Sequence, residues 1–333
     1  MLSSPDHSRG SQPRQEAASP DASLPPLAAA PRRLRRIHVE ITNRCNLSCD
    51  FCAIASRPAR VMAVESFAAL VPAVSALADE ITLHVLGEPL THPRLGDILA
   101  TAGAAALPVH VVTNGVLLDP ERRDLLLRPG VRQVIISLQS GMTLPAAALE
   151  AYLDRVLAFC DAAEASRPDL YINLRLWLAE GPQAGVDHPV VAARLSRHFG
   201  RDLRDLRVDV RRRKNVPLRG RQYLHVDSLF AWPSLALPEI ATTGTCHGLS
   251  THCGILADGT VVPCCLDADG VIALGNALAT PLDAILDSPR ARRLRDGFAD
   301  GELVEPLCRR CSFIRRFDPR GRRPRPRAPG AMG

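Results

Sequence analysis

The sequence predicts an α/β fold in which a parallel sheet closes, or partly closes, into a barrel. Short strand patterns alternate with helical patterns along the first 210 residues, and such repetition is typical of βα units joined by right-handed crossovers. Two groups of cysteines, near residue 50 and after residue 245, indicate metal-binding loops. At 333 residues the chain can hold one large or two modest domains.

Each predicted strand is a short apolar or alternating run, and each predicted helix has helical apolar spacing. The strands span Ile37–Ile41, Ile81–Leu86, Val109–Thr113, Gln133–Leu138, Tyr171–Leu178 and Leu206–Val210. The helices between them span 63–79, 94–106, 119–128, 145–165 and 188–199. Because ligands of α/β barrels collect at the C-terminal ends of the strands, we expect the functional site on the loops that follow them.

The loop after the first strand contains three cysteines, Cys45, Cys49 and Cys52, spaced C-x3-C-x2-C. A [4Fe-4S] cluster ordinarily takes four thiolates, so three ligands in one loop leave one iron open. A zinc knuckle or a group of buried, reduced thiols is the alternative. Zinc sites usually combine two CxxC units, which makes this alternative the weaker one.

Together with Phe51, this stretch, ITNRCNLSCDFC, resembles the radical S-adenosylmethionine (SAM) superfamily. The resemblance implies a partial (β/α)6 TIM-like barrel and a [4Fe-4S] cluster whose open iron binds the amino and carboxylate groups of SAM. It also implies reductive cleavage of SAM to a 5′-deoxyadenosyl radical. Such chemistry needs a reducing partner, for example flavodoxin or ferredoxin.

Polar residues follow the second and third predicted strands, end the fourth and lie on the fifth, and the resemblance gives them roles in SAM binding. Gly87 and Glu88 look like the turn that accepts hydrogen bonds from the SAM amino group, although the family usually has two glycines there. Ammonium has donors and no acceptors, so carbonyl and carboxylate oxygens suit it. Asn114 is either a further contact or a simple turn residue. The remaining candidates are Ser137, Gln139, Asn173 and Arg175.

The second cysteine group follows the pattern C-x12-G-x4-C, with Cys246, Gly259 and Cys264, and ends in a CxxC pair, Cys308 and Cys311. Between them, GILADGTVVPC predicts a β-hairpin that turns at Asp258-Gly259, and residues 281–298 predict a helix broken near Pro289. The arrangement resembles the SPASM extension in its shortened form, the twitch domain, which encloses one auxiliary [4Fe-4S] cluster. A four-thiolate zinc site is the alternative.

Three further cysteines lie outside these patterns. Cys253 and Cys265 are additional cluster ligands, inert core residues or hydrogen-atom donors to a substrate radical. Cys160 has apolar neighbours in a predicted helix and is expected to be a buried small side chain.

The domain prediction has five parts. They are a disordered arm (1–36), a radical SAM barrel (37–210), a connector read as an exposed basic loop and an apolar stretch (211–245), an auxiliary domain (246–314) and a disordered basic tail (315–333). In the connector, Arg211–Arg213, Lys214 and Trp232 are weak candidates for substrate contact. No export signal or membrane-length apolar run is present, so a cytoplasmic protein without a membrane partner is expected.

The net charge of +6 comes from the Arg- and Pro-rich ends, while the region between them is mildly acidic. This distribution disfavours a nucleic-acid partner.

The expected function is that of a radical SAM oxidoreductase or maturase with dehydrogenase-like chemistry. Its substrate is expected to be a small molecule, sugar-like or aminocyclitol-like, or a peptide, and the auxiliary cluster is expected to accept an electron. Two alternatives stay open. One is a radical epimerase that uses Cys253 or Cys265 as hydrogen donor, and the other is a non-catalytic iron–sulfur redox protein.

Overall fold

The structure is a computed structural model that describes residues 33–53, 56–179, 183–209 and 214–317, all of which belong to one compact unit. Most of the predicted arm and tail, together with Val210 and Arg211–Arg213, lies outside the described residues. Two of the predicted domain boundaries can be compared with the structure. The first strand begins at Leu34, within the predicted arm, and a short 3-10 helix, η2 (Ser312–Arg316), extends into the predicted tail.

A ten-stranded sheet forms the core, with strand order β12-β11-β10-β1-β2-β3-β4-β5-β9-β8. The parallel barrel strands are β1 (Leu34–Val39), β2 (Ala78–Thr82), β3 (Val109–Thr113), β4 (Val131–Ser137), β5 (Tyr171–Ala179) and β9 (Gln222–Ser228). The first and last of these pair with β10 and β8 instead of with each other. The barrel is therefore partial and open, as the sequence predicts.

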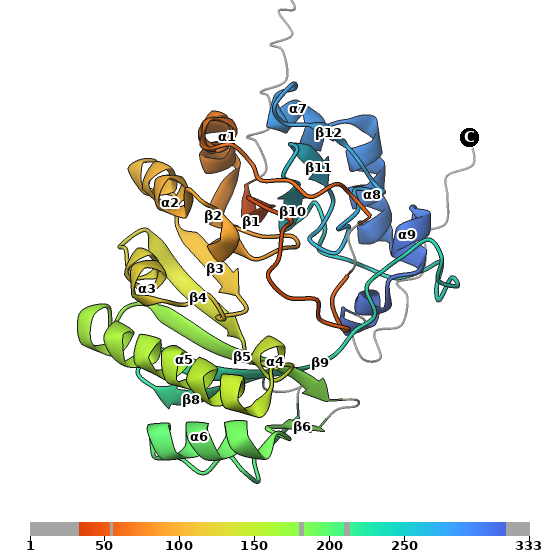
Figure 1. Cartoon of the computed structure of the whole chain (residues 1–333). Helices are drawn as coiled ribbons and strands as arrows, with labels where there is room; N and C mark the ends of the chain where they lie inside the picture. Colours follow the sequence, from red (N-terminus) through yellow and green to blue (C-terminus); the bar gives the residue numbers. More distant parts are fainter. Residues whose placement is uncertain (1–32, 54–55, 180–182, 210–213, 318–333) are drawn as a thin grey trace, which may run out of the picture. The chain divides into compact units, whose positions relative to one another are not determined.

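Helices cover the outer side of the curved sheet (Figure 1). They are α1 (Val64–Leu77), α2 (Leu95–Ala104), α3 (Pro120–Leu126), α5 (Ala146–Ser166) and α6 (Pro189–Phe199), with a short α4 (Leu138–Gly141) and a 3-10 helix η1 (Pro89–Thr91) at the strand ends. The second strand was predicted too late in the sequence. It starts at Ala78 directly after α1 and ends at Thr82, which leaves residues 83–88 free to form the loop that reaches the site.

The prediction of the sixth barrel strand was wrong. Leu206–Val210 was expected there, but β7 (Arg207–Asp209) pairs antiparallel with β6 (Gln183–Gly185) in a separate two-stranded sheet. The sixth strand is β9, which lies inside the predicted connector, preceded by an antiparallel β8 (Asn215–Arg219). The hairpin is hard to recognise in the sequence because basic residues and Gly220 interrupt its apolar pattern. Leu224 and Val226 nevertheless alternate and are fully buried.

The C-terminal extension continues the barrel sheet. The predicted hairpin is confirmed, with β10 (His252–Ile255) and β11 (Thr260–Val262) antiparallel, and β12 (Gly275–Asn276) follows. At its turn, Gly259 has φ +88°, which suits glycine. Because β10 pairs parallel with β1, the extension is joined to the barrel. The helices α7 (Leu282–Leu286), α8 (Pro289–Asp300) and α9 (Pro306–Arg309) complete it, with the expected break before Pro289.

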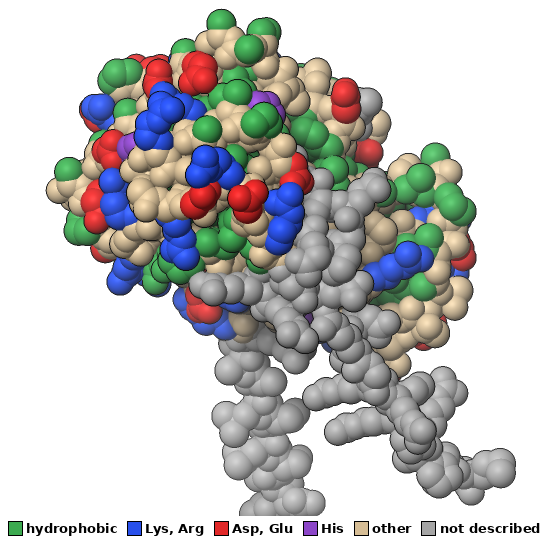
Figure 2. Space-filling model, turned by 90° about the horizontal axis from the view of Figure 1, so that it is seen from below, with side chains coloured by type: hydrophobic (Ala, Val, Ile, Leu, Met, Phe, Trp, Pro, Cys, Tyr) green, Lys and Arg blue, Asp and Glu red, His purple; other side chains and the backbone are tan. Residues whose placement is uncertain are grey.

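None of the helices in the described part of the chain has the length and apolar character needed to cross a membrane. On the face seen in Figure 2, basic and acidic side chains are interspersed between apolar ones.

Candidate active site

A cavity of about 430 Å³ lies at the C-terminal ends of the barrel strands, against the cysteine loop. The structure brings nine predicted residues together in its wall. They are Cys45, Cys49, Cys52, Gly87, Glu88, Asn114, Ser137, Gln139 and Arg175. Asn173 is not part of the wall, because it lies two residues earlier on β5, opposite Tyr223 of β9. Although β9 replaces the predicted sixth strand, the loops that form the cavity still meet at the same end of the barrel.

The cysteine loop is shaped by local hydrogen bonds. The amide of Cys52 donates to the carbonyl of Cys49 (3.0 Å), which closes the CxxC turn. The Sγ of Cys45 accepts from the Leu47 amide at 3.4 Å. N–H donors to a thiolate sulfur are among the features by which proteins tune iron–sulfur clusters. Three thiols at the mouth of an open cavity fit a cluster with one iron facing the cavity.

Gly87 lets the second loop approach the cysteine loop closely. It has φ +79°, and a Cβ atom at this position would lie 2.3 Å from the carbonyl oxygen of Thr42. The next amide, that of Glu88, donates to the Arg44 carbonyl (2.8 Å). The two loops therefore share a backbone contact that admits only glycine at position 87.

Glu88 is buried and joins two loops of the cavity. One carboxylate oxygen accepts from the Leu90 amide (3.0 Å) and the Thr113 hydroxyl (2.7 Å), and the other accepts from the Asn114 amide (2.6 Å). Burial raises the pKa of Glu88, and these donors oppose the rise. The carboxylate thus already orders the turn at Asn114, and its second oxygen accepts from one donor only among the described residues.

Asn114 is a turn residue that also contacts the cysteine loop. Its Oδ1 accepts from the Val116 amide (2.9 Å), as expected of a turn residue, while its Nδ2 donates to Asn46 Oδ1 (2.8 Å) and lies 3.8 Å from the Sγ of Cys45. The turn after β3 is thereby attached to the cysteine loop.

Arg175 is a half-buried cation in the cavity wall. It donates to the Ser137 hydroxyl (2.6 Å), and its guanidinium lies 4.1 Å from the centre of the Trp177 ring. Among the described residues it forms no ion pair, and its Nε has no partner. Burial lowers the pKa of Arg175 to about 10. An unpaired guanidinium facing a cavity suits a ligand carboxylate.

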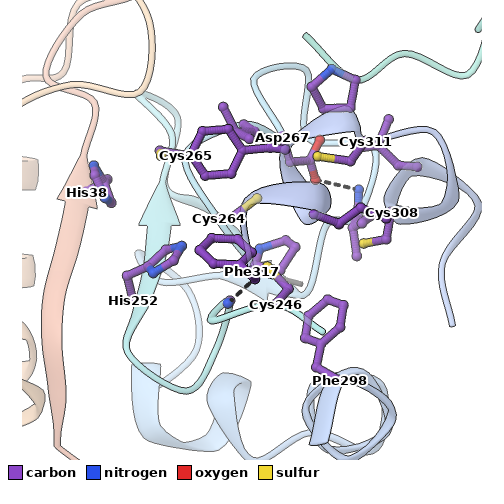
Figure 3. Close-up of a pocket in the computed structure, with 18 residues that line it drawn as sticks. His38, Cys246, His252, Cys264, Cys265, Asp267, Phe298, Cys308, Cys311 and Phe317 are labelled. Atoms are coloured by element: carbon purple, nitrogen blue, oxygen red, sulfur yellow. Dashed lines mark hydrogen bonds between the residues drawn. The ribbon is translucent and has the colours of Figure 1, made fainter. Parts of the chain in front are cut away.

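A second cavity, of about 240 Å³, lies in the C-terminal extension, and five cysteines contribute to its wall: Cys246, Cys264, Cys265, Cys308 and Cys311 (Figure 3). Its CxxC pair is closed by the same turn as the first one, with the Cys311 amide donating to the Cys308 carbonyl (3.2 Å). The Gly248 amide donates to the Sγ of Cys246 (3.4 Å). Thiols that surround an apolar cavity fit an enclosed cluster better than a solvated one.

The two additional cysteines of the extension differ in their surroundings. Cys253 is fully buried in the apolar core, and burial raises the pKa of its thiol to about 12. Cys265 lines the second cavity, and burial raises the pKa of its thiol to about 11 although the positive charge of Arg175 opposes the rise. Cys160 is buried in the core under α5, as expected.

A row of three histidines between the two cavities was not foreseen from the sequence. His84 lines the first cavity, whereas His38 and His252 line the second. The His38 ring centre lies 6.1 Å from that of His84 and 5.9 Å from that of His252. Burial lowers the pKa of all three, to about 3 for His84 and about 4 for His252. The alternation in IHVE and ITLH was the only available signal, since it places His38 and His84 on the inward face.

Comparison with known proteins decides between the metal sites that the sequence left open. Residues 39–169 match the radical SAM superfamily, and residues 246–312 match the iron–sulfur cluster-binding SPASM domain. The chain therefore contains a radical SAM domain followed by a SPASM domain. A radical SAM domain binds a [4Fe-4S] cluster and SAM, and the SPASM domain binds an auxiliary iron–sulfur cluster.

Several curated radical SAM relatives match the chain over part of their length. A GTP 3′,8-cyclase of Synechococcus sp. (strain CC9902) is 30% identical over 189 residues, which cover 52% of this chain and 55% of the relative. A PqqA peptide cyclase of Streptomyces rochei is 35% identical over 109 residues, 31% of this chain and 29% of the relative. The chain thus spans about half or less of the length of these relatives.

Solved structures share the fold. BtrN in complex with AdoMet and 2-DOIA superposes with a TM-score of 0.50 at 16% identity, covering 84% of this chain and 93% of BtrN. Streptococcus suis SuiB bound to its precursor peptide SuiA superposes with a TM-score of 0.54 at 14% identity, covering 79% of this chain and 67% of SuiB. At these identities the likeness concerns the fold alone.

Proposed function

We propose that this protein is a radical SAM oxidoreductase or maturase that oxidises or modifies a small molecule or a peptide, with the auxiliary cluster as electron acceptor. When bound, the first cluster supplies the electron that converts SAM to a 5′-deoxyadenosyl radical. The observation that carries the proposal is the pair of cysteine-lined cavities, linked by the row His84, His38 and His252. An electron acceptor close to the radical site suits a two-electron oxidation.

In this proposal, Cys45, Cys49 and Cys52 hold the first cluster, and Cys246, Cys264, Cys308 and Cys311 hold the auxiliary cluster. Carbonyl oxygens near Gly87 and the free acceptor capacity of Glu88 orient the SAM amino group. Arg175, held by Ser137 and Trp177, pairs with the SAM carboxylate. Gln139, whose buried Oε1 has no partner, is available to a ribose hydroxyl.

The substrate class is proposed from two kinds of relative. A PqqA peptide cyclase is a curated relative, and SuiB shares the fold while bound to a peptide. BtrN shares the fold while bound to 2-DOIA, and 93% of BtrN is covered by the match. Both a peptide and an aminocyclitol-like small molecule are therefore retained.

The decisive experiment is incubation of the reconstituted protein with SAM and dithionite. We expect 5′-deoxyadenosine, and we expect none from a Cys45→Ala variant that retains the auxiliary iron. No 5′-deoxyadenosine above the level of the Cys45→Ala control would reject the enzyme and favour a redox protein without SAM chemistry. The metal assignment predicts about eight irons per chain, which fall to about four in a Cys308→Ala/Cys311→Ala variant.

A radical epimerase is the second candidate, because Cys265 lines the auxiliary cavity and interacts with Arg175. The burial of Cys253 in the core makes Cys265 the better hydrogen donor of the two. For an epimerase, a Cys265→Ala variant should still cleave SAM but lose product, and deuterium from solvent should enter the product of the unmodified enzyme. Product without solvent deuterium supports oxidation instead.

A further inference from the structure

Ser56 and Arg57, which follow the cysteine loop, contact the auxiliary domain as well as their own barrel. The amide and the hydroxyl of Ser56 both donate to Asp269 Oδ1, at 2.8 and 3.0 Å. The Nε of Arg57 donates to the carbonyl of Ala268 at 2.7 Å. These partners are more than 200 residues away in sequence, and they lie a few residues after Cys264 and Cys265.

Glu40 extends this contact into the barrel. It is the residue after β1, its side chain is 0% exposed, and both its oxygens accept from Arg57 Nη2 at 2.9 Å. The Leu86 amide donates to one oxygen and the Ala257 amide to the other, both at 3.1 Å. One carboxylate therefore connects the cysteine loop, the loop that leads to Gly87 and the auxiliary hairpin.

Apolar packing supports the same junction. Ala53 and Trp232 pack on a small buried cluster that belongs to both halves of the molecule, and the Trp232 indole N–H donates to the carbonyl of Phe51 at 3.2 Å. The cluster consists of Val85, Leu86, Leu256, Val262 and Ala268. The residues on both sides of the SAM-cluster loop, Glu40 and Ala53, thus contact groups of the auxiliary domain.

We propose that Glu40 and Arg57 are positioning residues through which the auxiliary domain sets the geometry of the SAM-binding loop. Arg57 is only 12% exposed, so separating the pair would leave a buried charge without its partner. The loop is then held in one position relative to the auxiliary domain. This inference rests on the proposed ligand role of Cys45, Cys49 and Cys52, but not on the reaction that follows SAM cleavage.

A Glu40→Gln variant tests the proposal, because all partners of Glu40 are donors and a Gln amide nitrogen would face one of them. Glu80→Gln is the matched control, since Glu80 is also a barrel carboxylate paired with an arginine, Arg36, yet contacts neither cysteine loop. Partners that contact metal ligands directly typically change metal affinity or activity 10–100-fold, and Glu40, which acts through Arg57, is expected at the lower end of that range. We expect Glu40→Gln to raise the Kd for SAM about tenfold or more and Glu80→Gln to leave it unchanged, with both variants retaining about eight irons.

Asp269→Ala provides a second measurement if Glu40→Gln does not fold, because Asp269 is exposed at the edge of the same junction. It should raise the Kd for SAM by a smaller factor. An unchanged Kd in the folded variants, or an equal rise in Glu80→Gln, overturns the proposal. A failure of the cluster assignment itself would look different, since Cys45→Ala would then still bind and cleave SAM.

Discussion

Gly87 shows most directly how single residues build this site. Its backbone lies against the Thr42 carbonyl, and the loop that it starts presents Glu88 to the turn at Asn114. The glycine therefore serves the approach of two loops as much as any contact with SAM.

We predict that Gly87→Ala abolishes SAM binding while the barrel remains folded. The new Cβ would lie 2.3 Å from a backbone oxygen in a conformation with φ +79°, so the loop must move away from the cysteines. Iron content, circular dichroism and SAM binding by equilibrium dialysis measure the two effects. Gly103→Ala is the control, because a Cβ there meets nothing within 4 Å.

We predict that Arg175 strengthens SAM binding but lowers the free energy of unfolding. Arg175→Met removes a half-buried cation that has no ion pair among the described residues, so the free energy of unfolding should rise by roughly 1 kcal/mol. The Kd for SAM should rise at the same time, because the SAM carboxylate loses its partner. Urea unfolding and SAM binding check the prediction, and a less stable variant would show that Arg175 has a structural role.

The sequence-based element predictions succeed where the hydrophobic pattern is long and fail where it is short. The helices and the first five strands are found, with a shift of β2, because their apolar periodicity spans several turns or a whole buried strand. β9 was missed because only Leu224 and Val226 carry its pattern, next to a run of basic residues.

The position of β9 in the core predicts the effect of truncating it. Leu224→Ala should lower the free energy of unfolding by about 2–5 kcal/mol, because the side chain is fully buried between β5 and β8. Leu229→Ala, one residue beyond the strand and 42% exposed, should change it by less than about 0.5 kcal/mol. Equal effects in urea unfolding would contradict the assignment of β9 as the sixth barrel strand.

At the scale of the whole molecule, buried histidines should make the protein acid-labile. Burial lowers the folded-state pKa of His38, His84, His225 and His252, three of them to about 3 or 4. The unfolded chain has a histidine pKa near 6.5 and binds these protons first, so stability is complete above that pH and is lost as pH falls below it.

The expected slope reaches about 5 kcal/mol per pH unit near pH 5, from about 1.4 kcal/mol for each of four histidines. The urea midpoint measured anaerobically between pH 8 and pH 5 tests this. His84→Gln should reduce the slope by about a quarter, whereas Arg197→Gln, which removes no group that titrates there, should not. A constant midpoint down to pH 5 would contradict the burial of these rings.

The sequence alone determined which kinds of cofactor site this protein contains. Cysteine spacing and the glycine and asparagine turns are local patterns that indicate two thiol sites and turns suited to SAM binding. The alternation of strand and helix patterns indicates an open parallel barrel before any tertiary contact is known. Only the tertiary structure decided which residues connect the sites. The row of His84, His38 and His252 joins residues of different strands. Arg175 contacts Ser137 of the neighbouring strand but has no ion pair among the described residues. Glu40 contacts Ala257, which is more than 200 residues away in sequence. Strand register and loop packing bring such residues together, and neither is encoded in the spacing of a motif.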